Sequence, residues 1–500
     1  MKLAELVEGV AGATVRGDPA TAISGLAYHT RDVADGTLFF CVPGLKFDGH
    51  GFAARAAAAG AAALVCERDT GQPLTQVLVP SVRRALALMA ARWYGDPSRE
   101  LRTVGITGTN GKTTTAHLVA GVFAAAGLPA GLLGTVVNRI GGEDSPVTLT
   151  TAESLDLQRM FRAMVIAGDR ACALEVSSHA LAQDRAVGIR FEAAVFTNLT
   201  RDHLDYHADL DDYFAAKRRL FLTDDGRRGA ARAIVNVGDE YGRRLAEDCR
   251  PAYGEGLWTF AVGDEAGVPA DARALDLDLL ADGSAFTLLI PRLGLEERIT
   301  LRLAARFNVE NALAAATAGV ALGLSPAAVE RALAVSDGVP GRFEAVRAGQ
   351  PFSVVIDYSH TPDSLENALS AARAVTRGRV LVVFGCGGDR DRGKRPLMGS
   401  IGARLADRAF VTSDNPRSEE PLAIIDEIVT GVPPERLRTV TLEPDRRAAI
   451  RLALDAAHAE DTVVIAGKGH EQGQIIGDRR IPFDDRKVAE ELLAELRAEW

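Results

Sequence analysis

The sequence is poor in cysteine, has no excess of positive charge and lacks a long hydrophobic run. Its five cysteines stand at no zinc-ligand or redox-pair spacing, so we expect free thiols in a reducing compartment. A net charge of −10 argues against a nucleic-acid or membrane-surface protein, because either would present a basic face. The longest run of small apolar residues, Ala56 to Cys66, is too short to span a bilayer, and acidic residues stand where a secretion signal would be apolar. These absences predict a cytoplasmic protein that binds neither nucleic acid nor membrane.

Length and composition indicate a globular protein of several domains. Hydrophobic residues make up 47% and charged residues 25% of the 500 residues, which disfavours disorder. A chain of this length predicts about three domains. Breaks in the pattern occur at Tyr94–Ser98 and near Val339–Arg342, where glycine and proline interrupt the apolar runs. We therefore expect domains at residues 1–98, 99–337 and 338–500.

Apolar runs that alternate with helical stretches predict an α/β fold. In the first domain two strands, Leu38–Val42 and Ala63–Cys66, flank an alanine-rich helix. The second domain is expected to contain an antiparallel pair between Leu275 and Arg302. Its other expected strands are Val104–Thr107, Ala171–Val176, Ala193–Thr197 and Arg232–Val237, and its expected helices are Thr113–Ala126 and Val309–Leu322. The third domain is expected to contain the strands Phe352–Ile356, Arg379–Phe384, Ala409–Thr412 and Thr462–Ile465.

Polar clusters mostly stand directly after the predicted strands. They are residues 108–113, 175–179, 197–207, 357–360, 385–394, 414–417 and 467–471. In open α/β sheets, ligands bind outside the carboxyl ends of the strands. The clusters therefore predict one composite site that the second and third domains share.

A glycine-rich loop joins the strand that ends at Thr107 to the helix that follows it. Glycines let the backbone turn so that its N–H groups point at phosphate oxygens. Lys112 would neutralise the β and γ phosphates, and the Thr113 hydroxyl would hold Mg²⁺. The general pattern would place its first glycine at Ile106, whereas Gly105 stands one residue earlier. The expected ATP- or GTP-binding residues here are Gly108, Thr109, Asn110, Gly111, Lys112, Thr113 and Thr114.

Several motifs, in order along the chain, resemble those of the Mur ligase family. The loop Gly108-Thr-Asn-Gly-Lys-Thr-Thr114 has the form used by Mur ligases and by their relatives that extend folate with glutamates. Three further segments look like Mur ligase motifs: Glu175–His179, Thr197–His207 and Asp357–Pro362. Residues 385–391 and 414–417 narrow the resemblance to the members that add diaminopimelate, and the likeness runs from about residue 30 to 485.

The resemblance implies an ATP-dependent amide-bond ligase of cytoplasmic peptidoglycan precursor synthesis. In this family ATP phosphorylates the γ-carboxylate of D-glutamate in UDP-MurNAc-L-Ala-D-Glu. The amine of meso-diaminopimelate then attacks the acyl phosphate. The fold implied is a uridine-binding N-terminal α/β domain, a central P-loop ATPase-like domain with a parallel sheet, and a Rossmann-like C-terminal domain. The implied protein is a monomer whose partners are its small-molecule substrates.

The resemblance also implies catalytic and metal-binding residues. Glu175 and His203 match metal ligands near the phosphates, and Thr113 completes the first of two Mg²⁺ sites. Lys217 aligns with a lysine that captures CO₂ and becomes N6-carboxylysine, a carbamate that supports the second Mg²⁺. With Lys112, these residues are the expected catalytic set.

The nucleotide site is expected to extend beyond the loop. Asn308 and Asn311 resemble the segment that meets the adenine, although the family usually has glycine where Arg306 stands. Asp357 and His360 are expected to approach the nucleotide from the third domain.

Substrate residues follow from the resemblance as well. Thr30 lies in a segment like the family's uridine segment, where serine is frequent, and the loop 44–50 supplies a second contact. The residues expected to bind the UDP precursor are Thr30, Thr150, Thr151, Ser178, Gln183 and Arg185. Those expected to bind diaminopimelate are Arg390, Asp414, Asn415, Pro416, Arg417, Gly467 and Glu471. A site with an arginine for the second carboxylate should reject L-lysine, because the buried guanidinium would lose its partner.

Three other functions share parts of this sequence pattern. A folylpolyglutamate synthetase shares the phosphate loop, but the uridine-like segment and Asp414–Arg417 disfavour it. A nucleotide-switched module or motor leaves the arginines of the third domain unexplained. A dehydrogenase is disfavoured because residues 385–390 lack the last small residue of the dinucleotide fingerprint.

Overall fold

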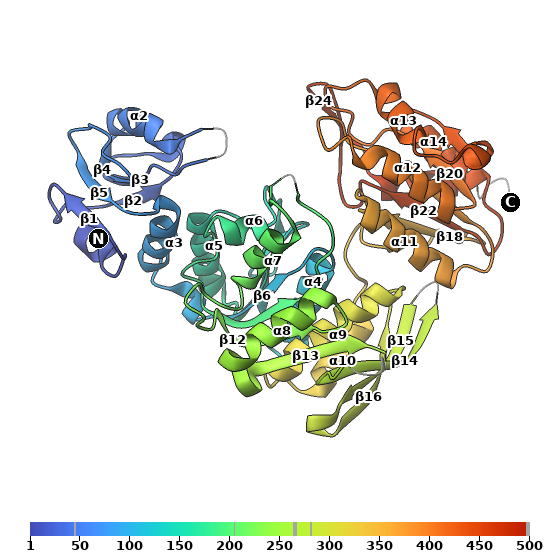
Figure 1. Ribbon diagram of the computed structural model, residues 1–500, viewed down its shortest axis with the longest axis horizontal. Coiled ribbons are helices and arrows are strands. Elements are labelled where there is room, and N and C mark those ends of the chain that lie inside the picture. The colour runs from blue at the N-terminus through green and yellow to red at the C-terminus, as the bar shows by residue number, and fades with distance from the viewer. Residues whose placement is uncertain (45–46, 205, 264–267, 281–282, 497–500) are drawn as a thin grey trace.

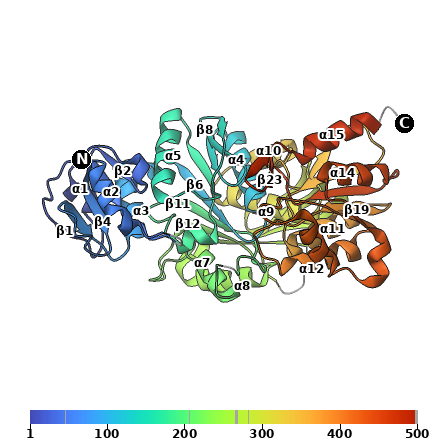
Figure 2. The same ribbon diagram turned by 90° about the horizontal axis from the view of Figure 1, so that it is seen from above.

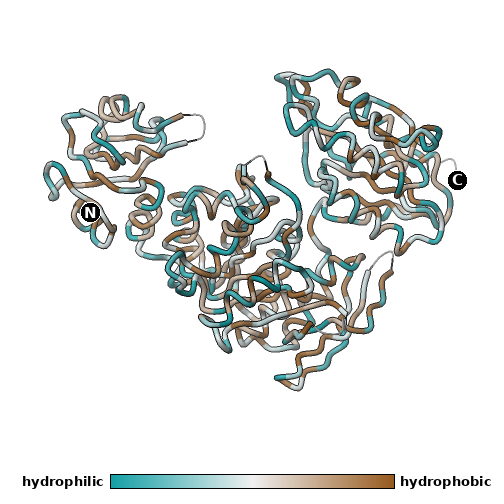
Figure 3. Tube along the Cα trace, viewed as in Figure 1, coloured by the Kyte–Doolittle hydropathy of each residue, from teal (hydrophilic) through white to brown (hydrophobic). Residues whose placement is uncertain are grey.

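The computed structural model describes residues 1–44, 47–204, 206–263, 268–280 and 283–496. Within these ranges the chain forms α/β domains that follow one another along the long axis, with the two termini at opposite ends (Figures 1 and 2). The predicted three-domain α/β fold is confirmed. Hydrophobic residues concentrate along the strands inside each domain (Figure 3). No helix in the described ranges has the length and apolar character needed to cross a membrane.

The N-terminal domain contains a five-stranded sheet in the order β1-β5-β4-β3-β2, which is parallel except for β1. Its strands are β1 (Thr14–Arg16), β2 (Gly25–Ala27), β3 (Thr37–Phe40), β4 (Ala61–Cys66) and β5 (Thr75–Leu78). Its helices are α1 (Leu3–Val7), α2 (Ala53–Ala58) and α3 (Val82–Trp93). All four residues of β3 are buried, as the apolar run predicts. Helix α3 begins where the Ser81 side chain accepts a hydrogen bond from the Arg84 N–H.

The central domain is built on an eleven-stranded sheet in the order β16-β15-β14-β13-β12-β11-β6-β10-β7-β8-β9. The parallel strands are β6 (Arg102–Thr107), β7 (Ala130–Leu133), β10 (Ala171–Glu175), β11 (Phe191–Phe196), β12 (Ala230–Asn236), β13 (Leu257–Val262) and β14 (Ala272–Leu280). Antiparallel strands extend both edges: β8 (Asn138–Ile140), β9 (Glu143–Ser145), β15 (Gly283–Ile290) and β16 (Leu295–Leu301). The predicted parallel sheet of the central domain is therefore extended at both edges by antiparallel strands.

The expected antiparallel pair between Leu275 and Arg302 is instead a meander of the three strands β14, β15 and β16. A turn of 3₁₀ helix at Pro291–Leu293, followed by Gly294 at φ 61°, reverses the chain inside what reads as one strand. Glycine adopts this conformation at little cost.

Helices cover both faces of the central sheet. They are α4 (Lys112–Ala125), α5 (Ser154–Ala167), α6 (Ser178–Ala182), α7 (Leu210–Arg218), α8 (Glu240–Tyr253), α9 (Arg306–Ala321) and α10 (Pro326–Val335). Helix α9 is alanine-rich and buried nearly all round, and it packs against α4 and β13. A helix apolar on every side is expected in such a position. The packing places the start of α9 beside the start of α4.

The C-terminal domain contains a six-stranded sheet in the order β17-β18-β22-β19-β20-β21, parallel except for β17. Its strands are β17 (Glu344–Val346), β18 (Ser353–Asp357), β19 (Val380–Phe384), β20 (Arg408–Val411), β21 (Val440–Leu442) and β22 (Thr462–Ala466). Its helices are α11 (Pro362–Val375), α12 (Lys394–Leu405), α13 (Pro421–Val429), α14 (Arg446–Asp455) and α15 (Asp485–Leu496). A separate hairpin joins β23 (Gln474–Ile476) to β24 (Arg479–Ile481).

Candidate active site

The glycine-rich loop runs from the end of β6 to the start of α4, as predicted. Gly108 has φ 153° and Gly111 has φ 84°. A Cβ on Gly108 would lie 1.9 Å from Thr197 Oγ1, and one on Gly111 would lie 2.2 Å from Asn311 Oδ1. The loop is therefore packed so closely against its neighbours that only glycine fits at these two positions.

Two lysines converge on this loop. Lys112 Nζ donates hydrogen bonds to the carbonyls of Gly108 (2.9 Å) and Thr109 (2.8 Å). Lys217 of α7 is 1% exposed, and its Nζ donates to the Gly108 carbonyl at 2.8 Å. Burial lowers the pKa of both lysines, and for Lys217 the positive charge of Lys112 lowers it further, against a smaller effect of Asp202. The site thus favours an uncharged Lys217 amine.

A buried carboxylate lies beside the first turn of α4. Glu175, the last residue of β10, is 0% exposed. It accepts hydrogen bonds from Thr113 Oγ1 (2.9 Å), Thr135 Oγ1 (3.0 Å) and the Thr135 N–H (2.7 Å). A Cβ on Gly134 would lie 2.2 Å from Glu175 Oε1, so the backbone can approach the carboxylate only at a glycine. Thr113 and Glu175 together present the oxygen ligands that Mg²⁺ prefers.

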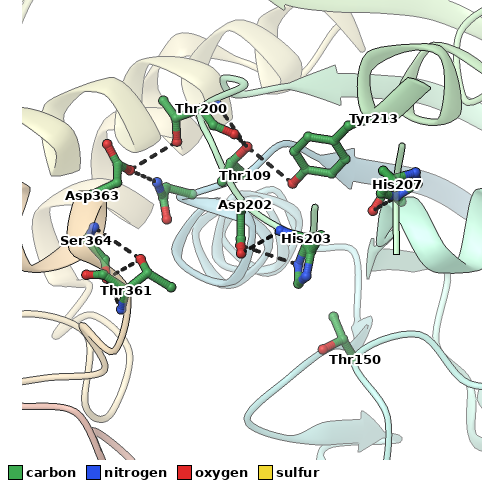
Figure 4. A network of polar contacts seen from close by, with 12 residues as sticks. Thr109, Thr150, Thr200, Asp202, His203, His207, Tyr213, Thr361, Asp363 and Ser364 are labelled. Atoms are coloured by element: carbon green, nitrogen blue, oxygen red, sulfur yellow. Dashed lines mark hydrogen bonds and ion pairs between the residues drawn. The ribbon is translucent and has the colours of Figure 1, made fainter. Parts of the chain in front are cut away.

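His203 lies on the loop after β11 (Figure 4). Its φ is 54°, an uncommon conformation for a residue other than glycine, and its Nε2 is 3.4 Å from Asp202 Oδ2. Its ring centroid is 4.9 Å from that of His179. Across the described ranges of the chain, no three His, Cys, Asp or Glu side chains group as metal ligands. Metal binding by His203 therefore stays a prediction. Asp205 of the same segment lies outside the described residues.

The segment after β11 holds the phosphate loop in place. Asn198 Oδ1 accepts the Asn110 N–H at 2.9 Å, and the Thr200 N–H donates to Thr109 Oγ1 at 3.0 Å. The Thr109 and Tyr213 hydroxyls are 3.2 Å apart (Figure 4). Neither Asn198 nor Thr200 was singled out from the sequence, although both lie in the motif at residues 197–207.

A cavity of about 190 Å³ opens next to the loop. It is lined by Asn198, Asn236, Gly238, Asp239, Val262, Arg306 and Glu310, and Asn311 lines a smaller space adjoining it. Asn311 Nδ2 donates to Asn308 Oδ1 at 3.3 Å, and Asn308 Nδ2 donates to the Ala304 carbonyl at 2.8 Å. Of the two predicted adenine contacts, Asn311 thus borders a cavity, whereas the Asn308 amide is bonded inside the first turns of α9.

Asp357 and His360 follow β18 in the third domain. Asp357 accepts hydrogen bonds from the N–H groups of Phe343 (2.7 Å) and Ser359 (2.9 Å), and its burial raises its pKa. His360 Nδ1 is 2.9 Å from the Tyr358 carbonyl, and burial lowers its pKa, with a further effect of Lys394. The bonds of Asp357 brace the start of the third domain, and nucleotide binding by either residue stays a prediction.

The third domain touches the phosphate loop through a residue that sequence analysis missed. Asp363, in the first turn of α11, accepts hydrogen bonds from Asn110 Nδ2 (2.9 Å) and Thr200 Oγ1 (3.0 Å) (Figure 4). A reciprocal cap between Thr361 and Ser364 holds this turn. The sequence shows the Asp363 carboxylate directly after the motif 357–362, but it cannot show the partners of that carboxylate, which are more than 160 positions away.

Most residues predicted to bind the precursor gather near Glu175. The Thr135 and Thr150 hydroxyl oxygens are 3.2 Å apart, and Thr151 Oγ1 donates to the Glu175 carbonyl at 2.8 Å. Arg185 donates to the Thr151 carbonyl and to Gln183 Oε1, both at 2.8 Å.

Two predicted precursor residues have other surroundings. Ser178 Oγ is 3.0 Å from His207 Nε2, and His207 Nδ1 is 3.2 Å from Asp212 Oδ2. Thr30 lies in a 3₁₀ turn of the N-terminal domain. In the second expected uridine loop, Leu45 and Lys46 lie outside the described residues.

The residues predicted to bind diaminopimelate follow three neighbouring strands, β22, β19 and β20. Asn415 Nδ2 donates to Glu471 Oε2 at 2.9 Å, and Arg417, at φ 52°, donates from Nη1 to the Gly388 carbonyl at 2.7 Å. Gly467 has φ 117°, and a Cβ there would lie 3.3 Å from Asp414 Oδ2. The exposed Arg390 donates to the Asp389 carbonyl. Pro416 follows Asn415 directly, and its carbonyl accepts the Glu419 N–H at 3.0 Å. The structure therefore brings Asp414, Asn415, Gly467 and Glu471 into one cluster.

Lys468, in the middle of this cluster, was also missed. It is 0% exposed, and its Nζ is 3.0 Å from Glu471 Oε2 and 3.1 Å from Asn415 Oδ1. Its position between Gly467 and Glu471 was the only signal in the sequence.

The geometry defines a class of protein: three α/β domains, a phosphate-binding loop in the central one, and a third domain that docks on that loop. Comparison with known proteins narrows the class. Residues 106–319 match the Mur ligase middle domain, residues 341–469 the Mur ligase glutamate ligase domain, and residues 22–94 the catalytic domain of the Mur ligase family. The chain belongs to the Mur ligase family.

Full-length relatives carry one name. A protein from Syntrophomonas wolfei is 43% identical over 99% of both chains, and one from Geobacillus thermodenitrificans is 44% identical over 99% of this chain and 100% of its own. Both are UDP-N-acetylmuramoyl-L-alanyl-D-glutamate–2,6-diaminopimelate ligases. A solved structure of a ligase of that name matches with a TM-score of 0.72 and 31% identity, over 99% of both chains.

Proposed function

We propose that this chain is the ATP-dependent ligase that adds meso-2,6-diaminopimelate to the γ-carboxylate of D-glutamate in UDP-MurNAc-L-Ala-D-Glu, as a monomer in the cytoplasm. The observation that carries the proposal is the full-length similarity, at 43% and 44% identity, to ligases of that name. The cluster of the buried Asp414 and Asn415 with the half-buried Glu471, beside Arg417, supports the choice of amino acid, since it offers groups for both an ammonium and a carboxylate.

The nucleotide would bind at the phosphate loop as ATP with Mg²⁺. Thr113 and Glu175 would hold the ion with oxygen ligands, and His203 would approach it from the loop after β11. Magnesium would supply positive charge to the phosphates during transfer. The loop's N–H groups would hold the phosphate oxygens, and Lys112 would release the Gly108 and Thr109 carbonyls to contact them.

The precursor's γ-carboxylate must approach a polyanionic phosphate, so the chain's main task is to neutralise and orient the two. Thr150, Thr151 and Arg185 lie close to Glu175 through the bonds described above and would position the dipeptide end of the precursor. The carboxylate would attack the γ-phosphorus to give an acyl phosphate and ADP. The amine would then attack the acyl carbon, and phosphate would leave.

Lys217 would carry the carbamate. A carbamate forms when an uncharged amine attacks CO₂ and loses a proton, and burial favours that uncharged amine here. The product carries a negative charge next to the Lys112 ammonium, and the attraction between the two stabilises it. Lys217→Ala should lose activity and regain part of it with added short carboxylic acids. A matched Lys487→Ala change, at an exposed lysine of α15, should have no effect. Near-normal activity without rescue would contradict the carbamate.

The reaction itself is tested by phosphate release from ATP and Mg²⁺ with UDP-MurNAc-L-Ala-D-Glu, comparing meso-diaminopimelate with L-lysine. We expect release with diaminopimelate and a product with the mass of the tripeptide precursor. Phosphate release with L-lysine in place of diaminopimelate would support an amide-bond ligase but refute the assignment of Asp414–Arg417 to diaminopimelate binding. No release with either amino acid would refute the proposed function.

A further inference from the structure

Lys468 is an ammonium enclosed by the loops that follow β20 and β22. It is fully buried, and its Nζ lies 3.0 Å from Glu471 Oε2, 3.1 Å from Asn415 Oδ1 and 3.5 Å from Asp414 Oδ1. An ammonium carries three N–H groups, and a buried one needs oxygen partners. Three oxygens surround it here. The Lys468 ammonium is therefore paired with oxygens of the protein and is not itself a ligand-binding group.

Lys468 fixes which way the Asn415 amide faces. Asn415 Oδ1 accepts from Lys468 Nζ and from the Ile475 N–H at 2.9 Å, while Asn415 Nδ2 donates to Glu471 Oε2 at 2.9 Å. In the flipped amide, Nδ2 would face two donors and Oδ1 would face a carboxylate, so three hydrogen bonds would be lost. Glu471 takes one of the two amide N–H groups. With the amide in this orientation, the second N–H of Asn415 Nδ2 remains a hydrogen-bond donor.

The ammonium also sets the charge of the cluster. Asp414 is 6% exposed, and its Oδ1 makes no hydrogen bond within the described part of the chain, although Lys468 is 3.5 Å away. With both carboxylates ionised, Asp414, Glu471 and Lys468 sum to one negative charge. Arg446, which lies near Gly467, is bonded to Asp485 through two N–H···O contacts of 2.7 Å. One net negative charge beside the Arg417 guanidinium suits a zwitterion.

We propose that Lys468 is a positioning residue for specificity: it holds the Asn415 amide and the single negative charge that receive the zwitterionic end of the amino-acid substrate. The inference rests on the proposed function. Without the ammonium, Asp414 and Glu471 would leave a charge of −2 in the cluster. Such a pocket attracts an amino acid whose far end is only an ammonium more than one whose far end is a zwitterion. Loss of Lys468 should therefore weaken discrimination as well as binding.

The test uses Lys468→Met, which keeps the length without the charge, and Lys468→Gln, which keeps N–H donors for Asn415 without the charge. Lys487→Met is the matched control, since this lysine is exposed on α15 of the same domain. The measured quantities are KM for diaminopimelate, ATP and the precursor, and the ratio of kcat/KM for diaminopimelate to that for L-lysine. Thermal melting reports folding. We expect the two Lys468 variants to raise KM for diaminopimelate at least 20-fold, to leave KM for ATP within about threefold, and to lower the ratio at least tenfold.

The outcomes are distinguishable. If the parent protein is inactive with diaminopimelate, the proposed function is refuted. If the parent is active and a folded Lys468 variant keeps the ratio of kcat/KM for diaminopimelate to that for L-lysine within twofold of the parent's, the positioning role alone is refuted. A uniform loss for both amino acids would point to a purely structural lysine and would also overturn the inference, as would unfolding of both variants at 25 °C.

Discussion

Gly111→Ala should destabilise the central domain and weaken ATP binding, whereas Gly121→Ala, on the same helix, should do neither. Gly111 precedes α4 with φ 84°, and an added Cβ would lie 2.2 Å from Asn311 Oδ1. Around Gly121 an added Cβ meets nothing within 4 Å. The two changes add the same methyl group to one element, so they separate the local geometry of the loop from any general effect of the substitution.

The magnitude follows from two costs. A side chain in the left-handed region costs roughly 1–2 kcal/mol. The Asn311 amide would also have to move, and it is bonded to Asn308 and Thr115, at about 0.5–1.5 kcal/mol for each bond. Gly111→Ala should therefore lose about 2–5 kcal/mol of the free energy of unfolding. Gly121→Ala should gain about 0.5–1 kcal/mol, because alanine is the better helix former.

Urea unfolding followed by the fluorescence of Trp258 measures this in the central domain. The chain has three tryptophans, so Trp93 and Trp500 are replaced by phenylalanine in every variant. Calorimetric titration with Mg-ATP gives the second readout, and we expect at least a tenfold loss of affinity for Gly111→Ala. If Gly111→Ala unfolds at the parent's urea concentration and binds ATP as tightly, the reasoning from loop packing is wrong.

Three further predictions concern the C-terminal domain. Asp485→Ala leaves the fully buried Arg446 without its carboxylate and should cost about 3–5 kcal/mol, measured as a lower urea midpoint. Burial lowers the pKa of His470 to about 4, with a further effect of Arg342, so the unfolded chain binds more protons between pH 6.5 and 4. Stability should fall as the pH drops through that window, and His470→Gln should flatten the difference in urea midpoint between pH 7 and 4.5. Asp363→Ala should loosen the domain contact and enlarge the radius of gyration in solution scattering, whereas Asp363→Asn, which keeps an acceptor oxygen, should not.

The strands that sequence analysis located were those with unbroken apolar runs. β6, β10 and β22 were placed within two residues of their observed bounds because all or nearly all of their residues are buried. β1 and β2 have three residues each and are largely exposed or half-buried, so they carry no such signal. Short strands of this kind exist because neighbouring strands pair with them, and that pairing cannot be read from the segment alone.

The site residues also differ in whether the sequence alone could predict them. The phosphate loop was readable because its function depends on consecutive residues whose backbone must turn, and glycine marks such turns. Asp363 and Lys468 were not readable, because each acts through partners from other loops: Asn110 and Thr200 for the first, Asn415 for the second. An aspartate in the first turn of a helix is common for reasons of helix stability alone. Only the fold distinguishes a docking contact from a helix-stabilising charge.

The order of the strands explains why separate motifs form one site. In the central sheet β11, β6 and β10 are neighbours, so the loops at residues 197–207, 108–113 and 175–179 meet at one edge. In the third domain β18, β22, β19 and β20 are neighbours, which brings together the loops that hold Asp357, Lys468, Arg390 and Asp414. Each half is already held by its own hydrogen bonds. The contact between the halves combines two hydrogen bonds of Asp363 with the edge-on packing of Phe307 from the central domain against Phe343 from the third. A contact of that size can form and break during a catalytic cycle without unfolding either domain.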